Sequence, residues 1–479
     1  MKGYVATPEV VVDMMVSKLF QYGPPSPDCT VLDAGCGNGA FVEGIIRWCE
    51  KRHVAIPNIV GVELDSRHIP EVRMRFENYS SVRIEERDFL IPDENTYEYI
   101  IGNPPYVPIT ELSEQEKAHY RKSYETAKGR FDLYLLFFEQ ALRSLKLGGR
   151  LVFVTPEKFL YVDTAFPLRK LLSTNWLEEV RMLAEGVFRD LVTYPTITTI
   201  TNGPGPRETN VVLRNGGTLH ATFPTDGSSW LPVINGKEET KSKYKLADVC
   251  LRVSCGVATG ADSVFVRKTN ELDSVLRRFA YPTIAGRELK PKVRDLHTVH
   301  VMLIPYARDG HLMNPKELGG FLKHLSRPEL RKRLEARTCV YVSHKPWYAF
   351  HENPPLAEIL GPKILCKDIT SRPQFWIDRR GTIVPRHSVY YIVPKDTKRI
   401  KELASYLNSE TARSWLEANS RRAASSYLRL QSRVLKRLPV PERLVRSVAS
   451  ESTEVRKTKS YYGSLDTGTS DRRGTDPLG

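Results

Sequence analysis

The sequence predicts two folded domains, an N-terminal α/β domain and a C-terminal α+β domain. At 479 residues the chain is longer than one ordinary domain. Residues 1–200 alternate short apolar runs with helical patterns, which is the rhythm of a sheet built from βαβ units. The charge also differs between the halves. Residues 1–240 hold 26 Lys and Arg against 32 Asp and Glu (net −6), whereas residues 241–479 hold 45 against 24 (net +21).

The elements of the first domain follow from this pattern in order. The first helix is expected to begin with Thr7 as N-cap and Pro8 at its first position, with apolar residues at helical spacing up to Leu19. Strands are expected at 30–32, 58–62, 97–101 and 150–155, and helices at 41–48, 71–76 and 132–145. Two later β-prone runs, 196–200 and 210–213, flank Asn-Gly-Pro-Gly-Pro, which predicts a hairpin at the sheet edge.

We expect the first domain to span residues 1–225 and the second to span 240–447. A stretch rich in Gly and Ser with little periodicity, at about 215–243, is expected to link them. Residues 448–479 are rich in Ser, Thr, Arg and Gly with few large apolar groups, so this tail is expected to be disordered.

Composition excludes several classes of protein. The longest apolar runs, 133–138 and 151–154, are too short to cross a bilayer, and the N-terminus lacks a secretory signal. The seven cysteines include no CxxC pair, which predicts reduced thiols, no metal and a cytoplasmic protein. A basic excess confined to one half predicts a polyanion partner, since a merely solvated surface usually mixes signs. Charge alone does not separate DNA from RNA.

The first motif, Asp33-Ala-Gly-Cys-Gly-Asn-Gly39, lies where a strand turns into a helix. Glycines such as Gly35 and Gly37 tighten the turn and let the backbone approach a ligand, although dinucleotide-binding folds share this feature. The spacing is GxGxG rather than GxGxxG, and Asp33 would repel a pyrophosphate. An acid here can instead accept hydrogen bonds from a cationic amino acid moiety. S-adenosylmethionine carries such a group and has no phosphate.

Two further acids follow at successive strand ends. Glu63 comes directly after the second apolar run, where a carboxylate can take both ribose hydroxyls, while Asp65 is better placed to cap the next helix. Asp88 can accept from the adenine amino group of the cofactor, and Phe89 can pack on its ring. Each acid alone is more often a cap or a surface group. Their ordered succession predicts a site for S-adenosylmethionine.

The tetrapeptide Asn103-Pro104-Pro105-Tyr106 follows the strand at 97–101, at the edge of the sheet where ligands bind. A proline turn that merely ends a strand would have a similar composition. The Asn103 side-chain oxygen and the Pro104 carbonyl can accept the two N–H protons of a conjugated amine and aim its lone pair at a methyl donor. Two prolines stiffen this loop, and Tyr106 offers an aromatic face to a planar substrate.

In this order the motifs resemble those of the gamma class of DNA adenine-N6 methyltransferases, the TaqI-like modification enzymes of type II restriction–modification systems. The resemblance covers roughly residues 3–440, including Ala6-Thr7-Pro8-Glu9 in the first helix. It implies a Rossmann-like S-adenosylmethionine-dependent methyltransferase domain with a mixed sheet, followed by an α+β target-recognition domain. The glycine motif has the common DxGCGxG form, so it supports use of the cofactor but not the DNA class.

The resemblance also implies roles for individual residues. Phe188, in Glu-Gly-Val-Phe, matches a residue that packs on a flipped base, which makes it the second stacking residue beside Tyr106. The predicted cofactor contacts are Thr7, Asp33, Gly35, Gly37, Glu63, Asp88, Phe89 and Pro105. Looser C-terminal matches lie at 256–260, 286–290, 345–348, 362–368, 407–409 and 438–441.

The function implied is site-specific methylation of N6 of a flipped adenine in double-stranded DNA. The enzyme would act as a monomer on the prokaryotic nucleoid and protect host DNA from a cognate restriction endonuclease. Some RNA adenine methyltransferases and the glutamine-N5 methyltransferases of release factors share the tetrapeptide, and cytosine-N4 enzymes usually have Ser in place of Asn103. A DNA-binding subunit with a vestigial catalytic domain is disfavoured by the intact motifs. The recognition sequence does not follow from the chain.

Overall fold

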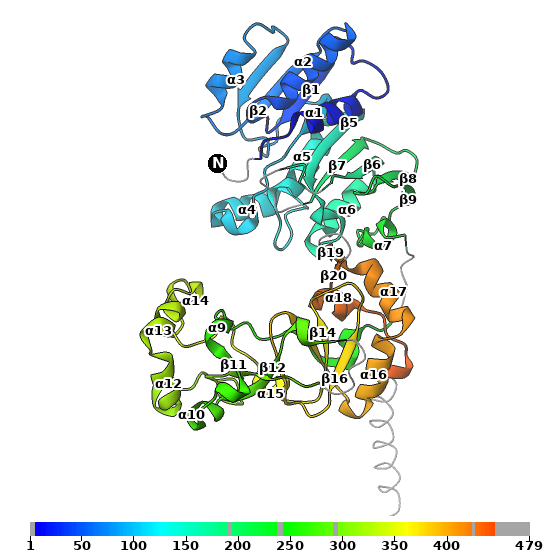
Figure 1. Cartoon of the computed structure of the whole chain (residues 1–479). Helices are drawn as coiled ribbons and strands as arrows, with labels where there is room; N and C mark the ends of the chain where they lie inside the picture. Colours follow the sequence, from blue (N-terminus) through cyan, green and yellow to red (C-terminus); the bar gives the residue numbers. More distant parts are fainter. Residues whose placement is uncertain are drawn as a thin grey trace, which may run out of the picture. The chain divides into compact units, whose positions relative to one another are not determined.

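The computed structural model describes residues 5–184, 186–188, 194–236, 243–290, 296–423 and 427–445. The chain forms two compact units, Met1–Glu238 and Glu239–Gly479 (Figure 1). Within the described residues, no helix is both long and apolar enough to span a bilayer. The tail at 448–479, predicted to be disordered, lies outside the described residues.

The first unit is built on a nine-stranded mixed sheet with the order β3-β2-β1-β4-β5-β7-β6-β8-β9. The five strands from β3 to β5 are parallel, and β7 runs antiparallel between β5 and β6. The strands are β1 (Thr30–Ala34), β2 (Asn58–Glu63), β3 (Val82–Glu86), β4 (Tyr97–Gly102), β5 (Leu145–Pro156), β6 (Trp176–Met182), β7 (Pro195–Thr201), β8 (Glu208–Val212) and β9 (Thr218–Thr222). This is the mixed sheet that the sequence predicts.

Helices cover both faces of this sheet, and strand residues alternate between two hydrophobic cores. Leu32 and Ile100 pack in one core with α4, α5 and α6, whereas their neighbours Val31 and Ile101 pack in the other with α1, α2 and α3. The helices are α1 (Glu9–Leu19), α2 (Ala40–Arg52), α3 (Ile69–Arg75), α4 (Glu114–Ser123), α5 (Leu133–Ser144), α6 (Phe166–Leu172) and α7 (Leu231–Ile234), with 3-10 turns η1 (Ile109–Glu111), η2 (Glu157–Leu160) and η3 (Asp163–Ala165).

Three predictions about local structure were wrong. Asp65 does not cap α3, whose N-cap is His68, and its carboxylate pairs with Arg67 instead. Helix α1 is capped by Pro8, whose carbonyl accepts the first helical N–H bonds, because the Thr7 hydroxyl accepts a bond from Asn103 instead. The runs at 196–200 and 210–213 do not form a hairpin. Strand β6 lies between β7 and β8 and pairs with both.

Of the stretch predicted as a linker, 215–243, residues 215–236 belong to the first unit, and 237–242 lie outside the described residues. The stretch contains the edge strand β9 and the short helix α7. Trp230 is fully buried in the core, and its ring stacks on Phe223 with centroids 4.4 Å apart. The Gly- and Ser-rich turns at 226–229 suggested a linker, but the aromatic pair around them buries enough apolar surface to hold the segment on the sheet.

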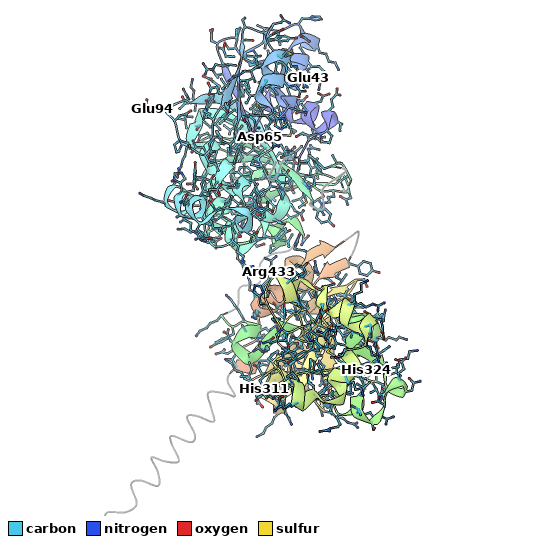
Figure 2. The ribbon with its side chains drawn as sticks, turned by 90° about the vertical axis from the view of Figure 1, so that its left-hand side faces the viewer. Glu43, Asp65, Glu94, His311, His324 and Arg433 are labelled. Carbon is cyan, nitrogen blue, oxygen red and sulfur yellow. The ribbon has the colours of Figure 1, made fainter. Side chains whose placement is uncertain are left out.

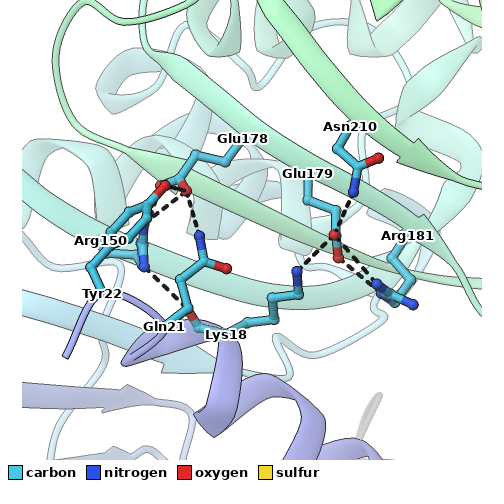
Figure 3. Close-up of polar contacts among 8 residues, drawn as sticks. All are labelled: Lys18, Gln21, Tyr22, Arg150, Glu178, Glu179, Arg181 and Asn210. Carbon is cyan, nitrogen blue, oxygen red and sulfur yellow. Dashed lines mark hydrogen bonds and ion pairs between the residues drawn. The ribbon is translucent and has the colours of Figure 1, made fainter. Parts of the chain in front are cut away.

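Two consecutive glutamates in β6 fix the C-terminal end of α1 to the sheet (Figure 3). Arg150 donates to both oxygens of Glu178 at 2.7 Å, and both side chains are only 5% exposed. Tyr22 and Gln21, just beyond α1, donate to the same carboxylate. The neighbouring Glu179 accepts bonds from Lys18 in α1, from Arg181 and from Asn210.

The second unit contains three small sheets. The first has the order β10-β18-β14-β16, the second β11-β13-β12-β17 and the third β15-β20-β19. Their bounds are β10 (Cys250–Cys255), β11 (Val266–Lys268), β12 (Ala280–Ile284), β13 (His300–Leu303), β14 (Lys363–Lys367), β15 (Ile369–Thr370), β16 (Phe375–Asp378), β17 (Val384–Pro385), β18 (Val389–Pro394), β19 (Arg421–Ala423) and β20 (Tyr427–Arg429).

Short helices pack around these sheets and complete an α+β unit with two hydrophobic cores. They are α8 (Leu246–Val249), α9 (Asp262–Phe265), α10 (Ser274–Arg277), α11 (Pro315–Leu318), α12 (Gly320–Leu325), α13 (Pro328–Glu335), α14 (Thr338–Tyr341), α15 (Leu356–Ile359), α16 (Ile400–Leu407), α17 (Glu410–Asn419) and α18 (Ser432–Arg437), with η4 (Thr269–Glu271), η5 (Gly286–Glu288) and η6 (Thr397–Arg399). The buried ammonium of Lys363 in β14 pairs with Asp378 in the neighbouring strand β16 at 2.6 Å. The α+β class was predicted correctly.

Candidate functional site

A cavity of about 490 Å³ opens in the first unit at the carboxyl ends of β1, β2, β3 and β4. This is where an open α/β sheet binds its ligands, and the volume suits a small-molecule cofactor. Asp65, labelled in Figure 2, is among the residues that line it. Seven of the predicted site residues line this cavity: Thr7, Gly35, Glu63, Asp88, Phe89, Asn103 and Pro105. The other five are Asp33, Gly37, Pro104, Tyr106 and Phe188, and their positions are given below.

The turn after β1 forms the floor of the cavity. Gly35, Gly37 and Gly39 all have left-handed backbone conformations, with φ of 78°, 53° and 81°. Residues with a Cβ rarely adopt this conformation, which accounts for the glycine spacing. The N–H groups of Gly35 and Cys36 donate to the carbonyl of Val62, so the turn is held against β2.

The Glu63 carboxylate, at the end of β2, is held rigidly beside this turn. One oxygen accepts the N–H of Gly37 at 2.8 Å, and the other accepts the N–H groups of Leu64 and Asp65 at 2.9 and 2.8 Å. A carboxylate has about four acceptor positions, so these three bonds leave roughly one position for a ligand hydroxyl. Gly37 therefore acts on the site through Glu63.

Asp33 is completely buried in β1, directly behind the cavity wall, and neither of its carboxyl oxygens has a hydrogen-bond partner. Burial raises the pKa of Asp33 well above its usual range, and the charge of Glu63 raises it further. The N–H of Val42 opposes this shift without reaching hydrogen-bond geometry. A buried carboxyl without partners is costly unless it is protonated or meets a cation.

Asp88 and Phe89 occupy the loop after β3. The Asp88 carboxylate accepts the N–H of Leu90 at 2.8 Å and lines the cavity, and burial raises its pKa. The ring of Phe89 is 4% exposed and packs against Phe137 of α5, with centroids 5.2 Å apart. An acceptor and an aromatic face thus lie next to each other, as the sequence predicts for an adenine ring.

Asn103 follows β4, and its amide has one defined orientation. Its nitrogen donates to the carbonyl of Val5 at 2.9 Å and to the hydroxyl of Thr7 at 3.1 Å. The amide oxygen is buried without any partner. Both N–H groups are satisfied by the segment before α1, so the oxygen is left to accept a bond from a ligand.

The remaining residues of the tetrapeptide support this loop. Pro105 lines the cavity, while Pro104 is buried and does not. The Tyr106 ring lies edge-on to Tyr134, with centroids 6.4 Å apart, and its hydroxyl lies 3.5 Å from the carbonyl of Val154. Burial raises the pKa of Tyr106, so its phenol stays neutral. Tyr106 does not line the cavity described above.

Phe188 lies apart from these residues in the structure. Its side chain is 4% exposed and packs in the core that contains α1 and α2. The first residue of its motif, Glu185, lies outside the described residues. The structure therefore brings together the cofactor residues and Asn103, but it does not bring Phe188 to the cavity.

Sequence reasoning missed two contributions to the site. The Val5 carbonyl holds the Asn103 amide, and a backbone group leaves no signal in the sequence. Leu133 and Phe137 also line the cavity, one helical turn apart in α5, although their spacing indicated only a core helix. Tyr120 of α4 closes the apolar side.

The residues present fit S-adenosylmethionine. Its ammonium, ribose hydroxyls and adenine amine are all hydrogen-bond donors, and the cavity offers acceptors in Glu63, Asp88 and the unpaired Asn103 oxygen. Asp33, whose carboxyl has no partner, does not line the cavity itself but lies two residues before Gly35, which does. Within the described residues no group of three His, Cys, Asp or Glu side chains could hold a metal ion.

Comparisons with known proteins match both halves of the chain. Residues 58–188 match the family model of the Eco57I restriction-modification methylase, and residues 283–440 match that of the TaqI-like C-terminal specificity domain. The type II methyltransferase M.PaeR7I of Pseudomonas aeruginosa is 28% identical over 400 residues, which cover 75% of this chain and 67% of that protein. M.XhoI of Xanthomonas vasicola is 26% identical over 74% of this chain and 70% of that protein.

A solved structure resembles both units. The type IIL restriction–modification enzyme MmeI in complex with DNA aligns with a TM-score of 0.57 and 14% identity, covering 96% of this chain and 68% of that one. The chain thus shares its fold with a restriction–modification enzyme of known structure. By sequence, the chain is therefore similar to restriction–modification methylases in its first half and to TaqI-like specificity domains in its second.

Proposed function

We propose that the chain transfers a methyl group from S-adenosylmethionine to the exocyclic N6 of adenine in double-stranded DNA. One observation carries this proposal. The Asn103 amide is held through its nitrogen by Val5 and Thr7, and its oxygen is buried without a partner at the cavity. An unpaired acceptor in that position suits a substrate that presents an N–H group.

The exocyclic amine of adenine is conjugated with its ring and is therefore a weak nucleophile. The Asn103 oxygen and the Pro104 carbonyl accept its two N–H groups, which shifts the lone pair toward sp3 character. The acceptors are preorganised, since Thr7 fixes the amide and two prolines stiffen the loop. S-adenosylmethionine supplies an electrophilic methyl group on a sulfonium sulfur. No side chain is needed as a base, because the amine loses its proton to water after transfer.

Three acidic residues of this chain would hold the cofactor. Asp33 meets the ammonium group, which relieves the cost of its buried charge. Glu63 takes a ribose hydroxyl in its remaining acceptor position. Asp88 accepts from the adenine amine, while Phe89 and Pro105 flank the ring.

DNA is the polymer that fits the whole chain best. The second half carries a net charge of +21, and the relatives are named as type II methyltransferases. A base in a duplex must be flipped out to reach the cavity. Tyr106 then stacks on it, and Phe188 reaches it only by leaving the core. We infer that a monomer modifies the site of a cognate endonuclease and protects host DNA.

The test is the modified nucleoside itself. We expect DNA from a host without adenine methylation to contain N6-methyldeoxyadenosine after expression of the wild-type chain, but not after expression of Asn103→Ala. Nucleoside mass spectrometry measures this, and sequencing of the modified positions reports the recognition sequence. Detection of N4-methyldeoxycytidine would contradict adenine as the modified base. Methylated RNA or release factor together with unmodified DNA would contradict DNA as the substrate. Unmodified DNA with intact cofactor binding would indicate a vestigial domain.

A further inference from the structure

The second unit contains a separate cavity of about 340 Å³ beside α9, β11 and β13. Four of its lining residues are basic: Arg267, Lys268, Arg287 and Arg386. Two are acidic, Asp262 and Glu271. With His300 counted as neutral, the lining itself carries a net charge of +2. This cavity belongs to the basic half of the chain, but the methyl-transfer chemistry does not use it.

Arg386 is the most constrained of these basic residues. It follows β17, and its side chain is 8% exposed. One terminal nitrogen donates to Glu288 at 3.1 Å, whereas the Nε–H is buried with no partner. An unsatisfied buried donor costs about 1–3 kcal/mol. Such a cost is expected where the surrounding structure keeps a group in place for a ligand.

Glu288 is not part of the lining but pairs with Arg386, so it offsets one of these charges and leaves a net charge of +1 (four basic residues against Asp262, Glu271 and Glu288). Its carboxylate accepts the N–H of Ala285 at 2.8 Å and contacts His300 at 2.8 Å as well as Arg386. A single charge is thus shared between an arginine and a histidine. Glu288 belongs to the 286–290 motif, which the sequence analysis singled out without a role.

In the part of the chain that the structure describes, the other basic side chains form no ion pair, although Arg267 already donates to the carbonyls of Ser263 and Val266. No carboxylate among the described residues forms an ion pair with Arg267, Lys268 or Arg287. The two acids of the lining already hold local structure: Asp262 accepts the Thr259 hydroxyl, and Glu271 accepts the backbone N–H of Lys268. Arg287 and Lys268 thus keep their charges without a described ion-pair partner at the cavity.

We propose that this cavity binds one backbone phosphate of duplex DNA, with Arg386 fixed at its base and Arg287 and Lys268 closing over the anion. This inference rests on DNA being the substrate. A phosphodiester carries one negative charge and free acceptor oxygens, which match the net charge and the unpaired donors. Such a contact positions the duplex and carries no sequence information.

The experiment uses the full chain and exposed residues, because Arg386→Gln could fail to fold. Arg287→Gln, Lys268→Gln and the double variant are compared with the wild type in binding to a duplex, from 50 to 200 mM salt. Loss of one phosphate contact lowers the slope of log Kd against log salt by about 0.9, so the wild type weakens about 3.5-fold more than the variants over this range. Both residues serve one phosphate, so the double variant should lose about the same slope as the stronger single variant.

Arg83→Gln is the matched control, because it removes one exposed charge from the acidic first unit. We expect it to keep the wild-type slope, and we expect all variants to methylate the same sequence positions as the wild type. A salt dependence of Kd in the double variant equal to that of the wild type would overturn the site. The site would also be overturned if inorganic phosphate stabilised the wild type but not the variants while all of them kept the same salt dependence of DNA binding. Plasmid methylation by the wild type, measured in parallel, shows whether such a failure is confined to this site or extends to the proposed function.

Discussion

Two regions of the same sheet differ in whether their buried acceptors have hydrogen-bond partners. Around β6, the carboxylates of Glu178 and Glu179 are saturated by arginine, lysine, amide and hydroxyl donors (Figure 3). By contrast, the amide oxygen of Asn103 at the cavity and both oxygens of the buried Asp33 have no partner. Buried polar groups are normally paired, so we interpret the saturated region as a structural anchor and the unsaturated region as part of the proposed ligand site. Mutations should therefore affect stability in the first region and methyl transfer in the second.

The largest expected effect is on stability, at the anchor. Arg150→Met leaves the Glu178 carboxylate buried and uncompensated, which should cost about 3–5 kcal/mol in the free energy of unfolding. Chemical denaturation measures this. Arg47→Ala is the control, because its pair with Asp13 is exposed and should contribute less than about 1 kcal/mol. The double variant Arg150→Met, Glu178→Leu should recover most of the loss. Equal costs for Arg150→Met and Arg47→Ala would remove the distinction between the two regions.

The same anchor shows why the sequence predicted only part of the fold. The apolar runs of β1, β2, β4 and β5 predict their strands without knowledge of other segments. Strand β6 was missed because Glu178-Glu179 suggests an exposed segment. The donors that make these carboxylates compatible with burial lie 28 positions away for Arg150 and 161 for Lys18. Because β6 was not predicted, the runs that form β7 and β8 were expected to pair with each other as a hairpin.

The second prediction concerns the cavity. Asn103→Ala removes the unpaired acceptor, and loss of one preorganised hydrogen-bonding group in an active site typically lowers kcat by about 10²–10³-fold. Single-turnover methylation measures the loss, and titration with S-adenosylmethionine should show less than about a twofold change in Kd. Activity within tenfold of the wild type would contradict the acceptor role. The thermal midpoint should stay near that of the wild type, in contrast to Arg150→Met.

The third prediction uses the raised pKa of Asp33. Ionisation of Asp33 destabilises the empty protein, because the folded state holds this proton to a higher pH than the unfolded state, where the pKa is about 4. Stability should therefore fall as pH rises from about 4 toward the folded pKa. Asp33→Asn removes this penalty, so its gain in thermal midpoint over the wild type should grow with pH. A gain in thermal midpoint that does not change with pH would contradict the raised pKa of Asp33.

Cofactor affinity should respond to the same proton with the opposite sign. A cationic ammonium requires the ionised carboxylate of Asp33, so the wild-type Kd for S-adenosylmethionine should rise as pH falls through the folded pKa. In Asp33→Asn, binding should be weaker and should lose this component of the pH dependence. Calorimetry across pH measures both. A wild-type affinity in the variant would mean that Asp33 contacts no cation.

The candidate site was easier to predict from the sequence than the fold around it. Asp33, Glu63 and Asp88 lie at successive ends of adjacent parallel strands, and such ends meet at one edge of a sheet. Chain order alone therefore groups them. The orientation of Asn103 could not be predicted, because it depends on the Val5 carbonyl, nearly a hundred residues away. Likewise, nothing local in the sequence indicated that Phe188 is buried in the core.

The smallest expected effect tests how the unpaired acceptor is held. Thr7→Val removes one of the two acceptors that fix the Asn103 nitrogen, and one hydrogen bond is worth about 1–1.5 kcal/mol. We expect kcat to fall about tenfold because the amide then samples the flipped orientation, while KM for DNA changes little. Thr7→Ser keeps the hydroxyl and should restore kcat. If Val and Ser lowered kcat equally, the methyl group of Thr7 would matter rather than its hydroxyl. In that case the Thr7 hydroxyl would not hold the Asn103 amide, and the burial of the amide oxygen alone would keep it directed at the substrate.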